Sequence, residues 1–282
     1  MPTIPSVRPS AIAGAWYEAD PQALARAIDA YLDQASLPDL PGEVIALIAP
    51  HAGHVYSGPV AGYAFAAARG LTPELVAIVS PMHHLYVQPL LTTAHSAYAT
   101  PLGEIPVDSE AVSDLDSRLY DTLGYGLVPV ANDQEHSLEI ELPFLQRALK
   151  SAFHLLPVML RVQTPEVARQ IGESLAETLR GKNALMVAST DLSHFYTQTI
   201  ANKLDAALLG QVAAFSPEGI FDLEQNGRGE ACGIGALAAV LWAARALGAD
   251  TVKVLKHATS GDVTGDFRRV VGYGAAVALK TK

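Results

Sequence analysis

Uninterrupted apolar runs of strand length constrain the fold of this chain most strongly. The clearest lie at residues 44–49, 75–79 and 184–188. A strand that is exposed on one side alternates apolar and polar residues, whereas a strand that is covered on both sides reads as a continuous apolar run. These runs therefore predict a sheet with both faces covered.

Helical patterns separate the runs and supply the cover. A helix is predicted from Asp20–Pro21 to about residue 34, and another from 164 to about 180, each with a capping residue followed by proline. Strands that alternate with helices are typical of α/β proteins. We predict a three-layer α/β/α sandwich around a mostly parallel or mixed sheet, and a single domain over residues 1–282, because no repeat or linker interrupts the chain.

Three local predictions follow from proline and glycine. Residues 53–58 are expected to form a mobile, polar-tipped loop. Residues 137–150 are expected to form one helix that Pro143 kinks. Residues 260–266 are expected to form a loop between the last two strands.

Charge and composition exclude several classes of function. The formal net charge of −10 argues against a nucleic-acid-binding surface or an anionic membrane surface. The single cysteine, Cys232, rules out an intramolecular disulfide and indicates a reducing compartment. We see no signal peptide, and the apolar helical run at 231–244 is too short to span a bilayer. We therefore expect a cytoplasmic protein without a membrane segment; its apolar helices are compatible with a homodimer.

Three of the strand-like runs lead into a histidine, at His51, His83 and His194. The carboxyl ends of parallel strands lie at one edge of a sheet, which is where α/β proteins place their sites. We expect the three histidines to converge there. The alternative is that each is a loop histidine satisfied by ordinary hydrogen bonds.

Cys232 lies where an apolar helix is expected to begin, behind Gly227 and Gly229. A helix N-terminus lowers the pKa of a thiol, and a thiolate with two imidazoles suits Zn, Fe or Cu. The alternatives are a small buried hydrophobic residue and a nucleophile paired with a histidine base.

Asp191 and His194 lie three residues apart after a strand and could form a carboxylate–imidazole pair for general acid/base chemistry. Alternatively, Asp191 caps a turn. Further residues expected to line the same cleft are His54, Tyr56, His84, Glu135 and His136.

These segments, in order, resemble those of a known family. The sequences RPSAIAGAWY, IAPHAGHVYSG, SPMHH, EHSLEIELPFL, STDLSHF, ACGIG and SGDVTGD are similar to those of the Memo family, many of whose prokaryotic members are labelled AmmeMemoRadiSam system protein B. The resemblance implies a fold like that of the class III extradiol dioxygenases of LigB type.

The resemblance also implies site residues. His51, His83 and Cys232 match the metal ligands, and His194, accompanied by Asp191, matches the acid/base. The bound ion would be one transition metal, with Fe preferred over Cu or Zn. The dioxygenases use two histidines and a glutamate, and Cys232 takes the place of that glutamate here.

Three functions are compatible with these residues. The first is a metal-dependent oxygenase of extradiol-dioxygenase type acting on an unidentified small molecule. The second is a non-catalytic adaptor whose cleft receives a peptide or a protein, for example another AmmeMemoRadiSam protein. The third is a zinc-dependent hydrolase.

Overall fold

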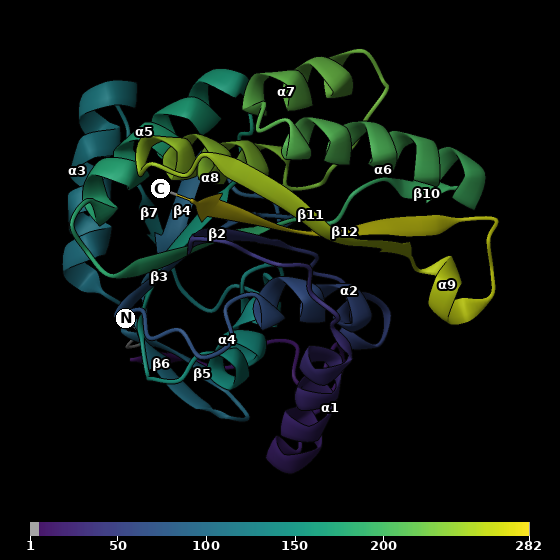
Figure 1. Cartoon of the computed structure of the whole chain (residues 1–282). Helices are drawn as coiled ribbons and strands as arrows, with labels where there is room; N and C mark the ends of the chain where they lie inside the picture. The colour runs from purple at the N-terminus through teal and green to yellow at the C-terminus, as the bar shows by residue number, and fades with distance from the viewer. Residues whose placement is uncertain (1–5, 282) are drawn as a thin grey trace.

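The computed structural model describes residues 6–281. Within these residues the centre of the fold is a nine-stranded mixed sheet with the order β10-β12-β2-β9-β3-β8-β4-β7, and β11 pairs with β12 (Figure 1). The four central strands are parallel: β2 (Glu43–Ala49), β9 (Ala184–Ser189), β3 (Leu75–Pro81) and β8 (His154–Leu160). The outer strands are β4 (Leu90–Thr93), β7 (Val128–Val130), β10 (His194–Tyr196), β11 (Thr251–Thr259) and β12 (Val270–Lys280).

The central strands are buried on both faces, as their apolar runs predict. All seven residues of β3 are buried. Val76 and Ile78 face one hydrophobic cluster, whereas Ala77 and Val79 face the other. This alternation between two cores requires a helical layer on each side of the sheet.

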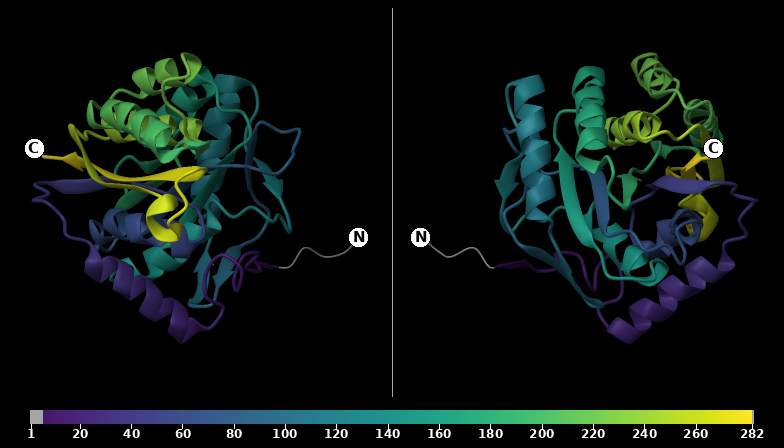
Figure 2. Two further views of the ribbon diagram at one scale, coloured as in Figure 1. Left: turned by 90° about the vertical axis from the view of Figure 1, so that its right-hand side faces the viewer. Right: turned by 60° about the vertical axis from the view of Figure 1, so that its left-hand side comes forward.

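The two helical layers are visible on opposite sides of the sheet in Figures 1 and 2. One layer contains α3 (Ser109–Leu123), α5 (Pro165–Leu179), α6 (Gln198–Ala213), α7 (Pro217–Gln225) and α8 (Ile234–Ala246). The other contains α1 (Pro21–Gln34), α2 (His54–Ala66), α4 (Leu142–Ala148) and a small sheet of β1 (Val7–Arg8), β5 (Ala97–Thr100) and β6 (Gly103–Pro106). The predicted three-layer α/β/α sandwich with a mixed sheet is confirmed.

Capping residues set the predicted helix starts. Asp20 Oδ1 accepts the Ala23 N–H at 2.8 Å, and Thr164 Oγ1 accepts the Val167 N–H at 3.3 Å. Proline follows each cap. A backbone N–H in the first turn has no intrahelical acceptor, so proline, which lacks this N–H, costs the helix no hydrogen bond there.

Three local predictions are wrong. Residues 53–58 do not form a loop, because α2 begins at His54, whose N–H donates to Trp16 O at 2.8 Å. The segment at 137–150 is not one kinked helix: a 3-10 turn, η1 (Glu139–Glu141), precedes α4, so that Pro143 lies in a first turn that tolerates it. The 260–266 segment contains the short helix α9 (Gly261–Thr264).

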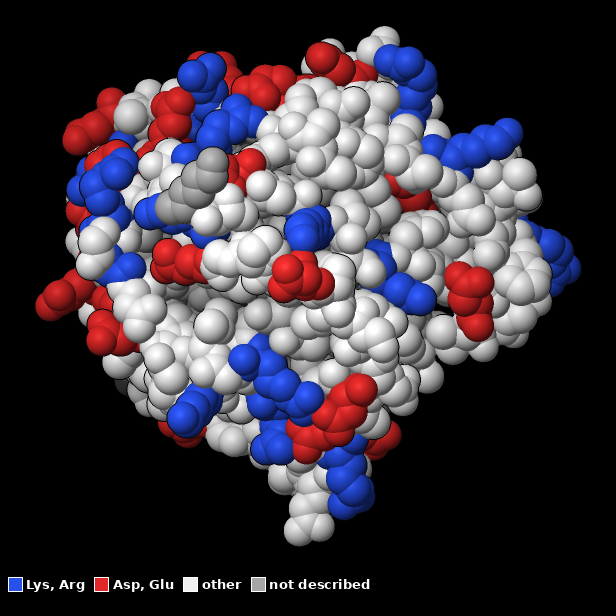
Figure 3. Space-filling model, in the orientation of Figure 1, with Lys and Arg blue, Asp and Glu red and all other residues white. Residues whose placement is uncertain are grey.

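Acidic and basic side chains are interspersed over the face shown in Figure 3. Several form exposed ion pairs, such as Arg69 with Asp33 and Arg147 with Asp29. Across the described residues, no helix is both long and apolar enough to cross a membrane.

Candidate metal centre

Three histidines meet at the carboxyl edge of the sheet. His51 follows β2 and His83 follows β3, while His136 lies in the loop between β7 and η1. Strand β9 runs between β2 and β3 and ends at Ser189. The parallel strands thus bring together residues that are far apart in the sequence.

We call His51, His83 and His136 the histidine cluster. Each offers one ring nitrogen, and these nitrogens lie within 4.8 Å of one another. The rings of His83 and His136 are stacked with centroids 4.6 Å apart, and the His51 ring is nearly perpendicular to both. His51 is buried, His136 is half-buried and His83 is exposed, so the cluster opens to solvent on one side.

Glu135 holds two members of the cluster. Its buried carboxylate accepts the backbone N–H groups of His83 and His136 at 2.5 and 3.0 Å, and Oε1 lies 2.9 Å from His83 Nδ1. Burial raises the pKa of Glu135, but the donors from His83, Ser137 and His136 outweigh it and hold the pKa well below the usual range. A carboxylate on Nδ1 fixes the ring and leaves Nε2 for a metal.

Ser189 fixes the tautomer of His51. Ser189 Oγ donates its proton to Ser137 O at 2.6 Å and lies 2.9 Å from His51 Nδ1. It can therefore only accept from Nδ1–H, which leaves the lone pair on Nε2. Burial, followed by the nearby His136 and His83, lowers the pKa of His51 well below its usual value, so the imidazole is neutral, as a metal ligand requires.

Cys232 contacts the cluster through His51. Its Sγ lies 3.1 Å from His51 Nε2 and accepts the Asp191 N–H at 3.3 Å, but it is not part of the group of ligand atoms within 4.8 Å. The expected low thiol pKa is wrong: burial first, and then the charge of Asp191, raise the pKa of Cys232. The residue lies in the turn before α8, and desolvation outweighs the helix dipole.

Asp191 does not pair with His194, which corrects a second expectation. Asp191 Oδ1 instead accepts the His51 N–H at 2.8 Å, and His194 Nδ1 lies 3.8 Å from Glu230 Oε1. Burial raises the pKa of Asp191 to about 7 and lowers that of His194. His194 nevertheless lies near the other two histidines. Its positive charge, when it is protonated, lowers the pKa of His51, and a protonated His83 lowers the pKa of His194.

The other candidates are divided between core and surface. His54 is buried, stacks on Tyr17 with centroids 5.2 Å apart, and lies with Nε2 3.1 Å from Ile140 O. It belongs to the core of the α2 layer. Tyr56 and His84 are exposed.

His136 was predicted to line the cleft but not to be a ligand. It comes six residues after the three-residue strand β7, so the rule of a histidine directly after a strand does not find it. Ser189 and Trp16 were not predicted as site residues, although the centroid of the Trp16 ring lies 4.1 Å from that of His136. The available signal for Trp16 was that it stands next to a second aromatic residue, Tyr17, in the N-terminal segment.

Comparison with known proteins gives a consistent result. The family model described as "Memo-like protein" matches residues 8–277. The chain is 36% identical to a MEMO1 family protein of Nitrosopumilus maritimus over 82% of this chain and 83% of that protein. It is 35% identical to a relative in Methanopyrus kandleri, over 96% of this chain and 98% of that protein. It is 36% identical to a relative in Thermotoga neapolitana, over 96% of this chain and 99% of that protein. A crystal structure of an uncharacterized protein from Escherichia coli K12 aligns with a TM-score of 0.49 and 14% identity, covering 83% of this chain and 100% of that one.

Proposed function

The chain belongs to the Memo family, and on that premise we propose that it is a metal-dependent enzyme of extradiol-dioxygenase type. The observation that carries the proposal is the histidine cluster, with three ligand nitrogens within 4.8 Å of one another. The proposed ligands are His51, His83 and Cys232, joined by His136.

The chemistry of these donors fits a transition metal. Neutral imidazoles suit Fe, Cu and Zn, whereas Mg and Ca prefer oxygen ligands. The Nδ1 atoms of His51 and His83 face Ser189 and Glu135, so their Nε2 atoms carry the lone pairs that a metal would take. When bound, an iron ion, preferred over copper or zinc, would supply Lewis acidity and redox chemistry.

His194 is the proposed acid/base. Burial lowers its pKa, so the ring is neutral at pH 7 and can accept a proton from a phenol-type substrate. Glu230 faces its Nδ1 at 3.8 Å and favours the imidazolium that forms. Asp191 supports the site by holding the backbone of His51.

One observation favours a second function, a non-catalytic adaptor. Two exposed aromatic side chains contact histidines of the site: Trp16, which is 37% exposed, contacts His136, and Phe195, which is 61% exposed, contacts His194. Exposed aromatic residues are common anchors for peptides and proteins. Such a protein would use the same cleft without turnover.

Metal analysis and oxygen uptake test the proposal. We expect anaerobically purified protein to contain about one iron per chain, and His51→Ala to lose it. Oxygen uptake with a panel of catechols should disappear in His194→Gln while the metal stays bound. Metal binding without any uptake would favour the adaptor, zinc-dependent turnover that needs no oxygen would indicate a hydrolase, and metal content unchanged in His51→Ala would overturn the proposed site.

A further inference from the structure

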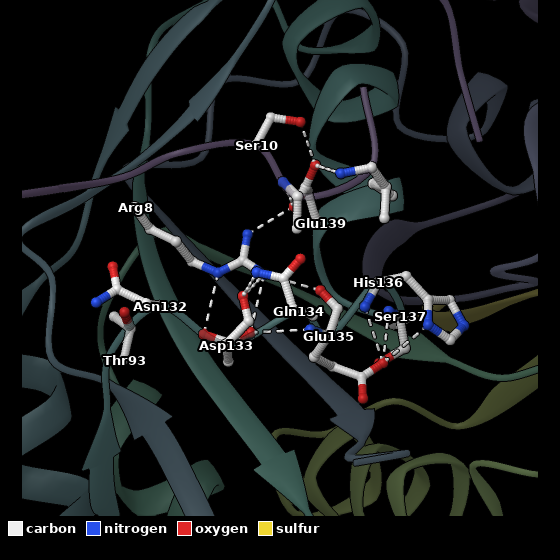
Figure 4. A network of polar contacts seen from close by, with 12 residues as sticks. Arg8, Ser10, Thr93, Asn132, Asp133, Gln134, Glu135, His136, Ser137 and Glu139 are labelled. Atoms are coloured by element: carbon white, nitrogen blue, oxygen red, sulfur yellow. Dashed lines mark hydrogen bonds and ion pairs between the residues drawn. The ribbon is translucent and has the colours of Figure 1, made fainter. Parts of the chain in front are cut away.

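Arg8 is a fully buried arginine outside the proposed ligand set. It lies on β1, and its side chain is 1% exposed. Nε and Nη2 donate to the two carboxylate oxygens of Asp133 at 3.1 and 2.8 Å, and Nη1 donates to Glu139 Oε2 at 2.6 Å (Figure 4). The guanidinium therefore bridges both ends of the loop at 133–139.

Glu139 ties the same loop to the N-terminal segment. Its Oε1 accepts the hydroxyls of Ser10 and Tyr17 at 2.5 and 2.8 Å, and its Oε2 accepts the Ala11 N–H at 2.9 Å. Arg8 and Glu139 thus hold residues 8–17 against the loop, and this places the Trp16 ring 4.1 Å from the ring of His136.

The network reaches the histidine cluster through Glu135. Arg8 Nη2 donates to Glu135 O at 2.8 Å, and Asp133 Oδ1 accepts the Glu135 N–H at 3.1 Å. Both backbone groups of Glu135 are therefore fixed by the network. The Glu135 side chain in turn holds His83 and His136.

We propose that Arg8 is a positioning residue for the metal centre: through Asp133, Glu139 and the carbonyl of Glu135, it fixes the loop that orients His83 and His136. The inference rests on the proposed function in one respect, namely that the histidine cluster binds a metal. It adds that the N-terminal segment is a structural part of that centre.

The contacts require an arginine. The three guanidinium nitrogens donate to five acceptor atoms on three residues, and Cζ lies 5.0 Å from the centroid of the Tyr98 ring. A lysine ammonium keeps the charge, but it cannot span Asp133 and Glu139 with the same geometry. Arg8→Lys is therefore the informative substitution.

The first experiment measures Zn²⁺ affinity by competition with a chromogenic chelator, and the absorption spectrum with Co²⁺. We expect Arg8→Lys to weaken Zn²⁺ binding by about 10- to 100-fold, the range found when residues that support metal ligands are lost, and to change the Co²⁺ spectrum. Arg147→Lys is the matched control, because Arg147 forms a similar two-pronged pair with Asp29 on the surface. It should leave both readouts unchanged.

A second measurement uses the unaltered protein, in case Arg8→Lys does not fold. Coupling between two sites is reciprocal, so Zn²⁺ binding should slow amide hydrogen exchange at residues 8–17 as well as at 133–139. Wild-type affinity and spectrum in Arg8→Lys, or unchanged exchange at 8–17 on saturation with Zn²⁺, would overturn the role of Arg8. Absence of Zn²⁺ and Co²⁺ binding by the wild-type protein would instead overturn the proposed metal centre.

Discussion

The Glu135 carboxylate contacts His83 at two atoms: Oε2 accepts the His83 backbone N–H at 2.5 Å, and Oε1 lies 2.9 Å from His83 Nδ1. Ring and main chain are thus fixed together. Because the Glu135 pKa lies well below its usual range, the carboxylate is ionised at neutral pH and accepts a hydrogen bond from His83 Nδ1–H, which leaves Nε2 to bind a metal.

Glu135→Gln should therefore weaken metal binding. The amide keeps the shape of the side chain, but it loses the charge and must present a donor where an acceptor is needed. We expect a loss of about 10- to 100-fold in Zn²⁺ affinity, measured by chelator competition. Glu177→Gln, which removes an exposed partner of Arg180, is the control and should bind as the wild type does.

Buried His54 should make stability depend on pH. Burial lowers its pKa from 6.5 to about 4. Below pH 6.5 the unfolded chain binds a proton at this position and the folded protein does not, so the free energy of unfolding falls as the pH decreases from 6.5 towards 4. Between pH 7 and pH 5 this one group should cost about 2 kcal/mol.

His54→Gln tests this contribution by urea denaturation at the two pH values. The fall in the free energy of unfolding should be smaller than in the wild type by about 2 kcal/mol. His154→Gln, at an exposed histidine that begins β8, should show the wild-type fall. An identical fall in all three proteins would contradict the assignment to His54.

Gly272 in β12 leaves room for the buried carboxylate of Asp205. Asp205 Oδ2 lies 2.8 Å from His257 Nε2, and a Cβ at Gly272 would stand 2.0 Å from that same oxygen. Gly272→Ala must displace a fully buried carboxylate, so we expect at least about 2 kcal/mol of destabilisation by thermal or urea unfolding.

Gly210→Ala provides the opposite control. Gly210 lies within α6, and no atom would approach its Cβ within 4 Å. The substitution should stabilise the protein by about 0.5–1 kcal/mol, because alanine has the higher helix propensity. Equal effects of the two substitutions would show that the space around Gly272 is not restricting.

The predictable parts of the fold are those that a local sequence pattern determines. Runs such as 75–79 indicated strands buried on both faces, and the parallel arrangement brought His51 and His83 together at one edge. The helix starts at Asp20 and Thr164 followed from capping chemistry. Local sequence was sufficient in each case.

The remaining parts depend on partners that are distant in the sequence. Arg8 and Asp133 are 125 positions apart, and no pattern within either segment indicates that one holds the other. The raised pKa of Cys232 was missed for a similar reason, since burial by the folded chain outweighs the dipole of the helix that follows. The position of His136 in the histidine cluster could not be predicted either, because it depends on the path of the loop at 133–139, which these contacts fix.

Cys232 should make metal binding depend on pH. Burial and Asp191 raise the pKa of its thiol, whereas the imidazole of His51 and that of His136, whose pKa burial lowers to about 4, are already neutral at pH 7. If the thiolate is a ligand, binding releases one proton, and Zn²⁺ affinity should rise by about tenfold per pH unit between pH 7.5 and 8.5, above the pKa of Asp191. In Cys232→Ser this slope should be close to zero, while His136→Gln should weaken binding at every pH and keep the slope. A slope that persists in Cys232→Ser would exclude the thiol as the source of the proton, and with it the place of Cys232 among the ligands.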